Sequence, residues 1–419
     1  MSHTPQPNQP VSDPAPFVDA GTFQGKTIVV GVTGSIAAYK AADLVSRLTQ
    51  AGADVRVILT AHAQEFIAPL TFRTLSGREA LTDLFAAPEA YRIRHLSLAE
   101  QADALIVAPA TANLIGKAAA GIADDLLTTT LLAVTCPLLF APAMNEAMYR
   151  NALVQRNLEV LREHGCLIIE PEEGWLACRQ VGRGRLAATE TLVQALALAL
   201  WQPKDYAGRR VLVTAGPTRE FLDPVRFLSN PSSGKMGYAL AAAAAQRGAS
   251  VTLVSGPTNL PPPYGVERVE VTSAAEMHAA VMARAAEQEV ILGAAAVADY
   301  APAERASQKV KKSEAEWTLT LRPTPDILAE LGQRKGNTVL VGFAAETENL
   351  AAHAQEKLRA KNLDAIAAND LTRAETGFQS DTNAVTLFFR DGRREDLPLM
   401  SKNALAHALL ERIRPLLGD

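Results

Sequence analysis

The chain has few cysteines, little excess charge and no zinc-type motif, and each of these shortages excludes a class of protein. Its 419 residues include three cysteines, an odd and small number that argues against a disulfide framework and favours a reducing compartment. No zinc-ligand spacing relates Cys136, Cys166 and Cys178 to one another. The formal net charge of −4 gives no support for binding to nucleic acid or to an anionic membrane.

The sequence also lacks a recognisable signal peptide or membrane span. Residues 1–24 are polar and rich in proline, with no basic region before an apolar core, so they are predicted to form a disordered tail. The longest uncharged run, Leu126 to Met144, contains a threonine cluster and two prolines, which predicts the end of a helix followed by a strand. We therefore expect a cytoplasmic protein.

Apolar runs alternate with helical patterns through the rest of the chain, which predicts parallel, doubly wound α/β sheets. Strands are expected in the first half at 26–32, 54–60, 102–110, 136–145 and 166–170, and in the second half at 209–214, 250–255, 289–295, 338–343 and 364–367. A hairpin at 383–399 and a helix at 401–416 follow. The predicted organisation is a first domain at 25–201, a polar linker at 202–208 and a second domain at 209–419.

The loop that opens the second domain has a strong local pattern. An apolar run at 211–214 leads into a polar loop that ends in Ser232-Ser233-Gly234-Lys235, where an alanine-rich helix begins. A strand, a loop of this kind and a helix N-terminus form the general design of an anion site. The loop is not a Walker A motif, because Ser229 and Met236 stand where that motif requires glycine and serine or threonine.

A second glycine-containing turn, Gly31-Val-Thr-Gly34-Ser35, lies between a strand and a helix near the start of the first domain. Its glycines allow a ligand to approach the backbone, and Ser35 can donate to a phosphate at the helix N-terminus. A tight turn without a ligand explains the pattern equally well. The turn lacks the third glycine and the acidic residue of a nicotinamide dinucleotide site, which favours a mononucleotide such as FMN.

Three further side chains of the first domain are candidates for chemistry, each with a structural alternative. His95 begins a helical pattern before a buried strand, where a lone histidine is more often structural than catalytic. Asn145 follows a strand at the carboxyl end of the sheet, where ligands bind, but asparagine there is an equally good helix N-cap. Cys178 lies among arginines in the irregular, glycine-containing loop 171–188, which suits a proton donor or nucleophile of lowered pKa.

The second domain contains groups suited to activating a carboxylate with a nucleoside triphosphate. Asp299 follows a buried strand, where it can face a metal ion or serve as a turn residue. The basic cluster 309–312 has the alternative of a solvated face. Phe343 ends a strand with a ring that can stack on a base, and Lys357 and Lys361 share a helix face, where like charges repel unless an anion lies between them.

Several motifs occur together in one order. GVTGSIAAYK, the His95 segment, APATANLIGKAAAGIADDLL, PAMN and ACxxxGxGR follow one another as in the flavin-dependent cysteine decarboxylases, and the second half contains RFxSNxSSGKMG. From about residue 25 to its end, the chain resembles the bifunctional phosphopantothenoylcysteine decarboxylase/phosphopantothenate–cysteine ligase family of coenzyme A biosynthesis.

For the first domain, the resemblance implies a flavodoxin-like, FMN-dependent enzyme that decarboxylates phosphopantothenoylcysteine to 4′-phosphopantetheine. His95 matches the family's catalytic histidine, Asn145 the residue that holds the substrate carboxylate, and Cys178 the proton donor. In the loop around Cys178, Arg179 and Ala188 replace a glycine and an acidic residue of the family pattern. The resemblance assigns FMN binding to Gly34, Ser35, Ile36, Thr60, Ala110 and Thr111.

For the second domain, the resemblance implies a Rossmann-like ligase that joins 4′-phosphopantothenate to cysteine through an acyl-cytidylate, with CTP and Mg²⁺. Asn230 and Lys309 would be catalytic, and Asp299 would serve the metal and the phosphates. The implied substrate and CTP site contains Gly293, Ala294, Ala295, Asp299, Lys309, Pro325, Asp326, Ile327, Leu328, Phe343, Lys357, Lys361, Arg226, Ser233 and Lys235. A homo-oligomer with trimeric flavin domains and dimeric ligase domains, forming a dodecamer, is also implied.

Two other functions are compatible with parts of the sequence. Some relatives of the first domain are regulatory flavin-binding subunits, but the presence of His95, Asn145 and Cys178 together argues against that function. A nicotinamide oxidoreductase of Rossmann type would require the dinucleotide fingerprint that the chain lacks.

Overall fold

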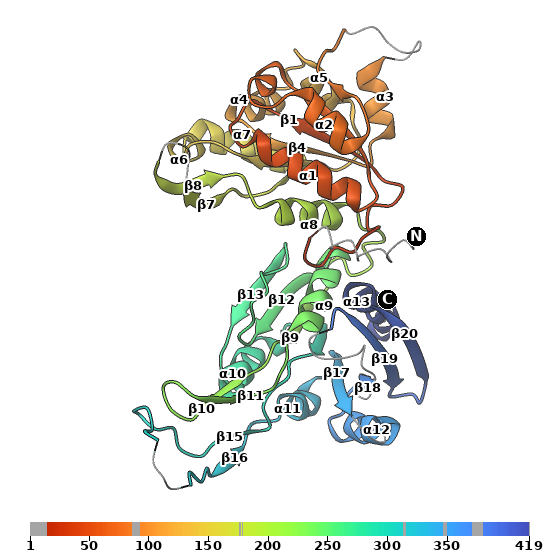
Figure 1. Ribbon diagram of the computed structural model, residues 1–419. Coiled ribbons are helices and arrows are strands. Elements are labelled where there is room, and N and C mark those ends of the chain that lie inside the picture. The colour runs from red at the N-terminus through yellow and green to blue at the C-terminus, as the bar shows by residue number, and fades with distance from the viewer. Residues whose placement is uncertain are drawn as a thin grey trace, which may run out of the picture. The chain divides into compact units, whose positions relative to one another are not determined.

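The computed structural model describes residues 15–85, 93–175, 177, 179–312, 316–346, 350–370 and 380–418. The chain forms two compact units that divide between Trp201 and Gln202 (Figure 1). Each unit has a central sheet with helices on both faces, as the alternating strand and helix patterns predict. No helix within the described residues is long and apolar enough to cross a membrane.

The first unit is built on a parallel sheet of six strands in the order β3-β2-β1-β4-β5-β6. The strands are β1 (Thr27–Val32), β2 (Asp54–Leu59), β3 (Ala80–Leu81), β4 (Ala104–Ala110), β5 (Leu138–Pro142) and β6 (Leu167–Ile168). Without the two-residue edge strand β3, this is the strand order of flavodoxin, with the switch point between β1 and β4. The flavodoxin-like fold is thereby confirmed.

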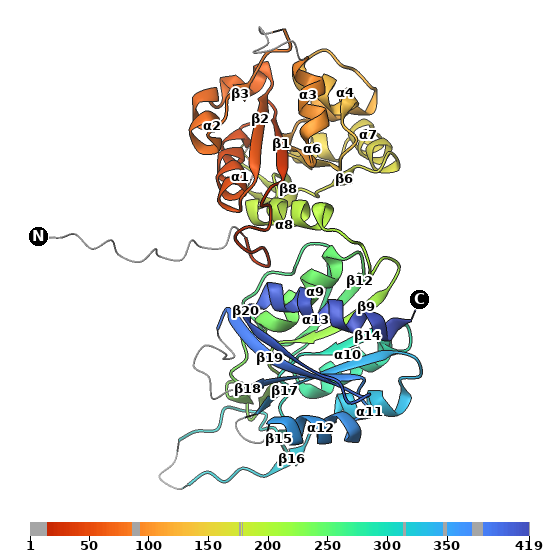
Figure 2. The ribbon, with the colours of Figure 1, turned by 90° about the vertical axis from the view of Figure 1, so that its right-hand side faces the viewer.

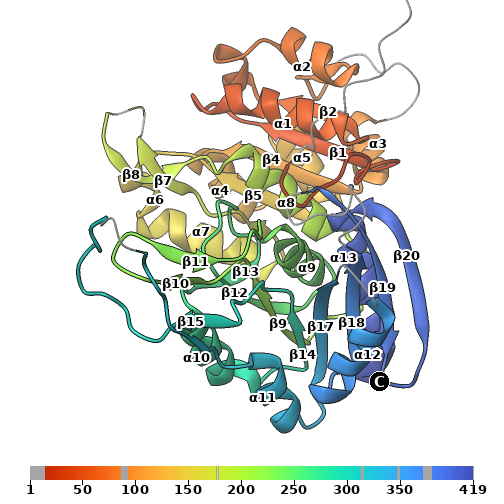
Figure 3. The same cartoon turned by 60° about the horizontal axis from the view of Figure 1, so that its bottom comes forward.

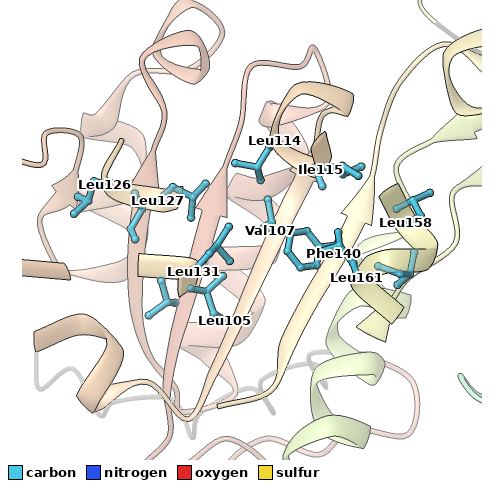
Figure 4. Close-up of a cluster of buried hydrophobic side chains, with 14 of the residues drawn as sticks. Leu105, Val107, Leu114, Ile115, Leu126, Leu127, Leu131, Phe140, Leu158 and Leu161 are labelled. Atoms are coloured by element: carbon cyan, nitrogen blue, oxygen red, sulfur yellow. The ribbon is translucent and has the colours of Figure 1, made fainter. Parts of the chain in front are cut away.

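Helices cover both faces of this sheet (Figure 2). On one face, α1 (Ala38–Gln50) packs against α2 (Pro69–Ser76) and α8 (Thr189–Leu200). On the other, leucines of α4 (Ala112–Ala119), α5 (Leu126–Ala133) and α7 (Ala152–Glu163) surround Leu105, Val107 and Phe140 of the sheet (Figure 4). Full burial of each such side chain contributes about 1.5–3 kcal/mol. This layer therefore fixes α4, which is joined to the end of β4 by its N-cap residue Thr111.

The folded part of the first unit begins earlier than the predicted tail allows. Phe23 is 1% exposed and its N–H donates to the carbonyl of Ala51 at 3.1 Å, beyond the end of α1. Val18 is equally buried. Burial of these two apolar side chains stabilises an ordered structure for residues 15–24. The prediction of disorder was therefore wrong for this stretch. Residues 1–14 lie outside the described part of the chain.

Segment 171–188, predicted to be irregular, contains an antiparallel ribbon of β7 (Glu172–Trp175) and β8 (Val181–Arg185). Burial alternates along β8, but the buried positions are Gly182 and Gly184. Because glycines occupy the inward face, no hydrophobic alternation marks this strand in the sequence.

The second unit is built on an eight-stranded sheet in the order β13-β12-β9-β14-β17-β18-β19-β20 (Figure 3). Its strands are parallel as far as β18, and β19 and β20 are antiparallel additions. The strands are β9 (Arg210–Ala215), β12 (Ser250–Ser255), β13 (Val266–Glu270), β14 (Val290–Gly293), β17 (Val339–Glu346), β18 (Ala365–Asp370), β19 (Thr382–Phe389) and β20 (Arg394–Ser401). The switch point lies between β9 and β14.

Within the described residues, two helices pack on one face of the second sheet and three on the other, and Figure 3 shows them around the sheet. The pair is α9 (Lys235–Gln246) and α13 (Lys402–Ile413), and α9 lies close to β9 and β12 because its packing face is alanine. The three are α10 (Ala274–Ala285), α11 (Ile327–Arg334) and α12 (Leu350–Ala360), whose apolar residues form a second core. Two short ribbons, β10 (Arg219–Phe221) with β11 (Phe227–Ser229) and β15 (Tyr300–Pro302) with β16 (Leu321–Pro323), complete the unit.

The predicted linker 202–208 is part of the second unit. Tyr206 has no exposed surface, and its hydroxyl donates to the carbonyl of Leu410 in α13 at 2.7 Å. Asp205 pairs with Arg247, whose guanidinium lies 5.4 Å from the centre of the Tyr206 ring. The polar composition of this segment predicts a linker because the partners of its charged side chains are distant in the sequence and cannot be recognised there.

Candidate active sites

The turns after β1, β2 and β4 meet at the carboxyl edge of the first sheet. The N–H of Thr60 donates to the carbonyl of Val32 at 3.1 Å. The buried Thr33 hydroxyl donates to the carbonyl of Pro109 at 2.7 Å and lies 3.1 Å from the N–H of Thr111, from which it accepts. The residues predicted to contact FMN all come from these turns: Gly34, Ser35, Ile36, Thr60, Ala110 and Thr111. Thr33, which ties two of the turns together, was missed in the sequence.

Three helices begin at this edge, which provides a place for an anion. Thr60 caps a short 3₁₀ helix (Ala61–Glu65), and Thr111 caps α4. The N-terminus of α1 has no side-chain cap, and the Ser35 hydroxyl accepts from the N–H of Ala37 at 3.3 Å. The positive end of the α1 dipole therefore remains for a phosphate. Beside it the Ile36 side chain is 59% exposed, an apolar surface that suits a flat ring system.

Asn145 follows β5 at the same edge, where the N–H of Ala143 donates to the carbonyl of Ala110 at 3.1 Å. Its Oδ1 accepts from the N–H of Ala147 at 2.8 Å, so Asn145 caps the four-residue helix α6 (Glu146–Tyr149). The structural alternative considered for Asn145 is thus present. This hydrogen bond occupies the side-chain oxygen of Asn145.

The ribbon β7–β8 lies against the Asn145 turn. The N–H of Met144 donates to the carbonyl of Gly184 at 3.0 Å. A Cβ added at Gly184 would lie 2.2 Å from the carbonyl oxygen of Met144, so only glycine permits this approach. The GxGR part of the loop motif therefore has a structural reason that is independent of chemistry.

The other two first-unit candidates are less tightly connected to this edge. His95 lies in the first turn of α3 (Arg94–Gln101), which packs against α5, and it makes no hydrogen bond to the edge residues in the described part of the chain. Cys178 lies outside the described residues, so its role stays a prediction. The neighbouring Arg179 has φ of +62°, in the left-handed region that glycine adopts without strain.

A cavity of about 490 Å³ opens at the switch point of the second sheet. Of the residues predicted for the second site, only Arg226 and Lys309 are absent from its wall. The others all line it: Asn230, Ser233, Lys235, Gly293, Ala294, Ala295, Asp299, Pro325, Asp326, Ile327, Leu328, Phe343, Lys357 and Lys361. Strand order alone brings these segments together, because β9, β14 and β17 are neighbours in the sheet.

The N-terminus of α9 forms part of the cavity wall. Gly234 caps the helix with φ of +78°, which glycine adopts without strain, and no side-chain hydrogen bond caps the helix. The Ser232 hydroxyl accepts from the N–H of Gly234 at 3.3 Å. This geometry keeps the character of an anion site that the sequence predicted for the loop.

Asn230 is held by the loop after β14. Its Nδ2 lies 3.2 Å from the carbonyl oxygens of both Ala296 and Val297, so both amide hydrogens have acceptors and the side chain offers its oxygen. Nearby, the N–H of Ala295 donates to the Thr214 hydroxyl at 3.2 Å. A base bound at Ala295 would therefore meet its carbonyl oxygen, which accepts from an exocyclic amine.

The cationic side of the cavity contains a protein carboxylate. Lys361 lies 2.9 Å from Asp326, which also caps α11. Burial disfavours the ionised Asp326, but the Lys361 ammonium and the N–H of Ala329 outweigh it and lower the pKa of this carboxyl. The spacing of Lys357 and Lys361 therefore does not by itself require an external anion, contrary to the inference from like charges.

Asp299 is exposed on the cavity wall. Among the described residues, no three His, Cys, Asp or Glu side chains lie together in a way that could hold a metal ion. A divalent cation at Asp299 would therefore take most of its oxygen ligands from a nucleotide and water, which is how Mg²⁺ is commonly bound in nucleotide sites.

Arg226 and the segment of Lys309 are joined through a buried carboxylate that the sequence did not reveal. Asp223 has no exposed surface and accepts from the N–H groups of Val225 and Arg226 at 2.8 Å and of Val310 at 3.2 Å. The Arg226 guanidinium donates to the carbonyl of Val310 at 3.0 Å. Asp223 thereby holds the basic segment against the β10–β11 ribbon.

Two family models match the chain. The flavoprotein model matches residues 20–200, and the DNA/pantothenate metabolism flavoprotein C-terminal domain matches residues 206–416. The chain is 50% identical over 398 residues to the coenzyme A biosynthesis bifunctional protein CoaBC of Bacillus subtilis strain 168, covering 94% of this chain and 98% of that protein. It is 48% identical over 397 residues to the protein of the same name from Escherichia coli strain K12, covering 94% and 97%.

Proposed function

Because this chain belongs to the family of the coenzyme A biosynthesis bifunctional proteins CoaBC, we propose that its two units catalyse consecutive steps with CTP, Mg²⁺ and FMN. The second unit joins 4′-phosphopantothenate to cysteine, and the first decarboxylates the product to 4′-phosphopantetheine. The observation that carries the proposal is the 490 Å³ cavity, whose wall combines a helix N-terminus, lysines, Asp299 and Asn230. A pocket with this wall suits a nucleotide together with a carboxylate substrate.

In the first unit, the α1 N-terminus with Ser35 would hold the FMN phosphate, and the turns of Thr60 and Thr111 would line the isoalloxazine ring. FMN supplies the capacity to accept electrons from the substrate and return them. Asn145, in the turn that follows β5 at the same edge, would hold the substrate carboxylate. The contact between Met144 and Gly184 joins the ribbon to this turn, which supports Cys178 as the proton donor.

In the second unit, the substrate carboxylate attacks the α-phosphorus of CTP and forms an acyl-cytidylate, while pyrophosphate leaves. The cysteine amine then attacks the acyl carbon, forms the amide and releases CMP. Asn230 would orient the acyl-cytidylate through its side-chain oxygen, and Lys309 would neutralise the charge on the transferring phosphate. Because the N–H of Ala295 already donates to the Thr214 hydroxyl, Ala295 would contact cytosine through its carbonyl oxygen. That oxygen would accept a hydrogen bond from the 4-amino group of the base.

The proposal includes a cytoplasmic homo-oligomer with trimeric first units and dimeric second units. Ile36, Tyr39, Phe66 and Leu70 have exposed side chains, at 59, 62, 50 and 63%, on segments at or near the FMN-binding edge. Apolar exposure of this kind marks interaction surfaces. Light scattering on the purified protein tests the assembly, and a monomer at micromolar concentration would contradict it.

A reconstitution experiment tests the two activities. Purified protein is mixed with phosphopantothenate, cysteine, CTP and Mg²⁺, and mass spectrometry detects phosphopantetheine. Omission of CTP should abolish product, whereas addition of phosphopantothenoylcysteine should restore CO₂ release without CTP. A yellow protein that releases no CO₂ from phosphopantothenoylcysteine would instead support a regulatory flavin-binding function.

A further inference from the structure

One carboxylate of the first unit, Glu170, accepts hydrogen bonds from three separate segments, and none of the roles above uses it. The Tyr149 hydroxyl, at the end of α6, donates to its Oε2. The Arg162 guanidinium of α7 donates to Oε1 at 2.6 Å, and the Arg183 guanidinium of β8 donates to Oε2 at 3.0 Å. A single exposed ion pair contributes little, but three donors on one carboxylate form a network that holds its members in place.

Glu170 is anchored to the sheet and not to the ribbon. The preceding residue, Ile169, is 1% exposed, and its N–H donates to the carbonyl of Phe140 in β5 at 2.8 Å. Arg162 is equally well anchored, because its neighbour Leu161 belongs to the buried core between α7 and the sheet. The network therefore joins a fixed carboxylate to a side chain of the ribbon β7–β8.

The ribbon has a structural need for such a side-chain contact. The face of β8 that meets the Asn145 turn consists of Gly182 and Gly184, which permit close approach but have no side chains to interlock with the turn. Arg183 lies between them and points to the opposite face, because successive side chains of a strand alternate. Its guanidinium reaches Glu170 and lies 5.8 Å from the centre of the Tyr149 ring.

Tyr149 connects the same carboxylate to the helix that Asn145 caps. It is the last residue of α6 and is 5% exposed. Burial, and then the hydrogen bond to Glu170, raise the pKa of Tyr149 to about 12, so the phenol remains a donor at neutral pH. Glu170 thus contacts both the segment after Asn145 and the strand that packs on it.

We propose that Glu170 is a positioning residue of the decarboxylase, which holds Arg183 and thereby keeps β8 at one place against the Asn145 turn. The assignment rests on the decarboxylase function proposed above, in which Cys178 is the proton donor. Cys178 precedes Val181, the first residue of β8, by three positions in the sequence. A displacement of β8 therefore displaces the donor as well.

The test compares Glu170→Ala and Arg183→Ala in the full-length, FMN-loaded enzyme with a matched control, Glu159→Ala. Glu159 also pairs with Arg162, at 3.1 Å, and its side chain is 61% exposed, so the control removes a partner of Arg162 and leaves that of Arg183. Tyr149→Phe removes the phenol and leaves the ion pair. For each variant we measure the FMN content, kcat and KM for phosphopantothenoylcysteine, and the single-turnover rates of CO₂ release and phosphopantetheine formation.

Glu170→Ala and Arg183→Ala should each lower kcat by roughly tenfold with FMN still bound, because a small misplacement of a catalytic group costs rate steeply. In a single turnover, phosphopantetheine formation should slow more than CO₂ release, because only the reprotonation that follows CO₂ release uses Cys178. The double variant should lose no more than the larger single loss, since the two residues act as a pair.

Three results would overturn the assignment. The first is an unchanged kcat, or equal slowing of CO₂ release and phosphopantetheine formation, in Glu170→Ala. The second is a loss in Glu159→Ala or Tyr149→Phe that equals the loss in Arg183→Ala. The third is a double variant in which the two single losses multiply, because independent residues behave in that way.

Hydrogen exchange separates the positioning role from the decarboxylase function itself. A wild-type protein that binds FMN but releases no CO₂ refutes the decarboxylase function. In that case, faster exchange in Glu170→Ala that is confined to peptides of β7, β8 and α6 would still support the positioning of the ribbon. Exchange equal to that of the wild type in these peptides refutes it.

Discussion

Lowering the pH from 7.5 to 5.0 is expected to destabilise the second unit by about 2 kcal/mol through one histidine, His407. His407 lies on α13, with Nε2 3.0 Å from the side-chain oxygen of Gln246 at the end of α9. Its backbone carbonyl accepts from the Arg247 guanidinium at 3.0 Å. Burial, and then the Arg247 charge, lower the pKa of His407 from 6.5 to about 3.

The sign follows from which state binds the proton first. With a pKa of about 3 in the folded protein and 6.5 in the unfolded chain, the unfolded chain is protonated first as the pH falls. The contribution of neutral His407 to the free energy of unfolding is therefore fully present above pH 6.5. It declines progressively as the pH falls from 6.5 towards 3. At pH 5.0, which is about 1.5 units below the unfolded-state pKa, proton binding to His407 stabilises the unfolded chain by about 2 kcal/mol.

Hydrogen exchange in the full-length protein measures this effect. The opening free energies of α9 and α13 peptides are determined at pH 7.5 and 5.0, after correction for intrinsic exchange rates. His407→Gln keeps a polar group towards Gln246 but does not titrate, so its opening energies should fall by about 2 kcal/mol less than those of the wild type. His164→Gln, at an exposed position of the first unit, should behave as the wild type does. Equal losses in the wild type and His407→Gln would show that His407 does not remain neutral in the folded unit.

Three substitutions test the two active sites. Cys178→Ser should leave FMN bound and stop decarboxylation at an oxidised substrate intermediate, detected by flavin absorbance and mass spectrometry; normal turnover would refute the proton-donor role. Asn230→Asp should let the acyl-cytidylate accumulate or block its conversion, as measured by rapid quench, and unchanged ligation would count against that role. Gly184→Ala places a Cβ 2.2 Å from the carbonyl oxygen of Met144; displacement of the ribbon should lower the decarboxylase kcat more than about tenfold with FMN still bound, and wild-type kcat would show that the ribbon position is unimportant.

The central strands could be predicted from the sequence because burial on both faces requires continuous apolar runs. β4 and β9 are examples, and their ends were correct to within two residues. Edge elements were missed for the opposite reason. β13 has only two apolar residues, Val266 and Val269, among its five positions, and β8 buries glycines, so neither has a pattern that identifies a strand.

The candidate sites show the same division between local and long-range information. Asn230 and Phe343 stand in recognisable motifs, and the structure brings both to one cavity. Lys402 and Asn383 line that cavity only because the sheet continues through β18 to β19 and α13, which no local pattern encodes. Asp223 and Thr33 act through hydrogen bonds to segments more than 70 positions away, which only the fold reveals.

The hydrogen bond between Tyr206 and Leu410 has a consequence for how such chains are assembled. It shows that the second unit starts and finishes at one place, and the Arg414 guanidinium reinforces this by donating to the carbonyl of Asp205 at 2.8 Å. A domain whose ends are neighbours can be joined to another protein through either end, or circularly permuted, without rearrangement of its sheet. Nothing in the fold of the ligase unit therefore requires the decarboxylase to precede it. The order of the two units in this chain is one of two that the fold of the second unit can accommodate.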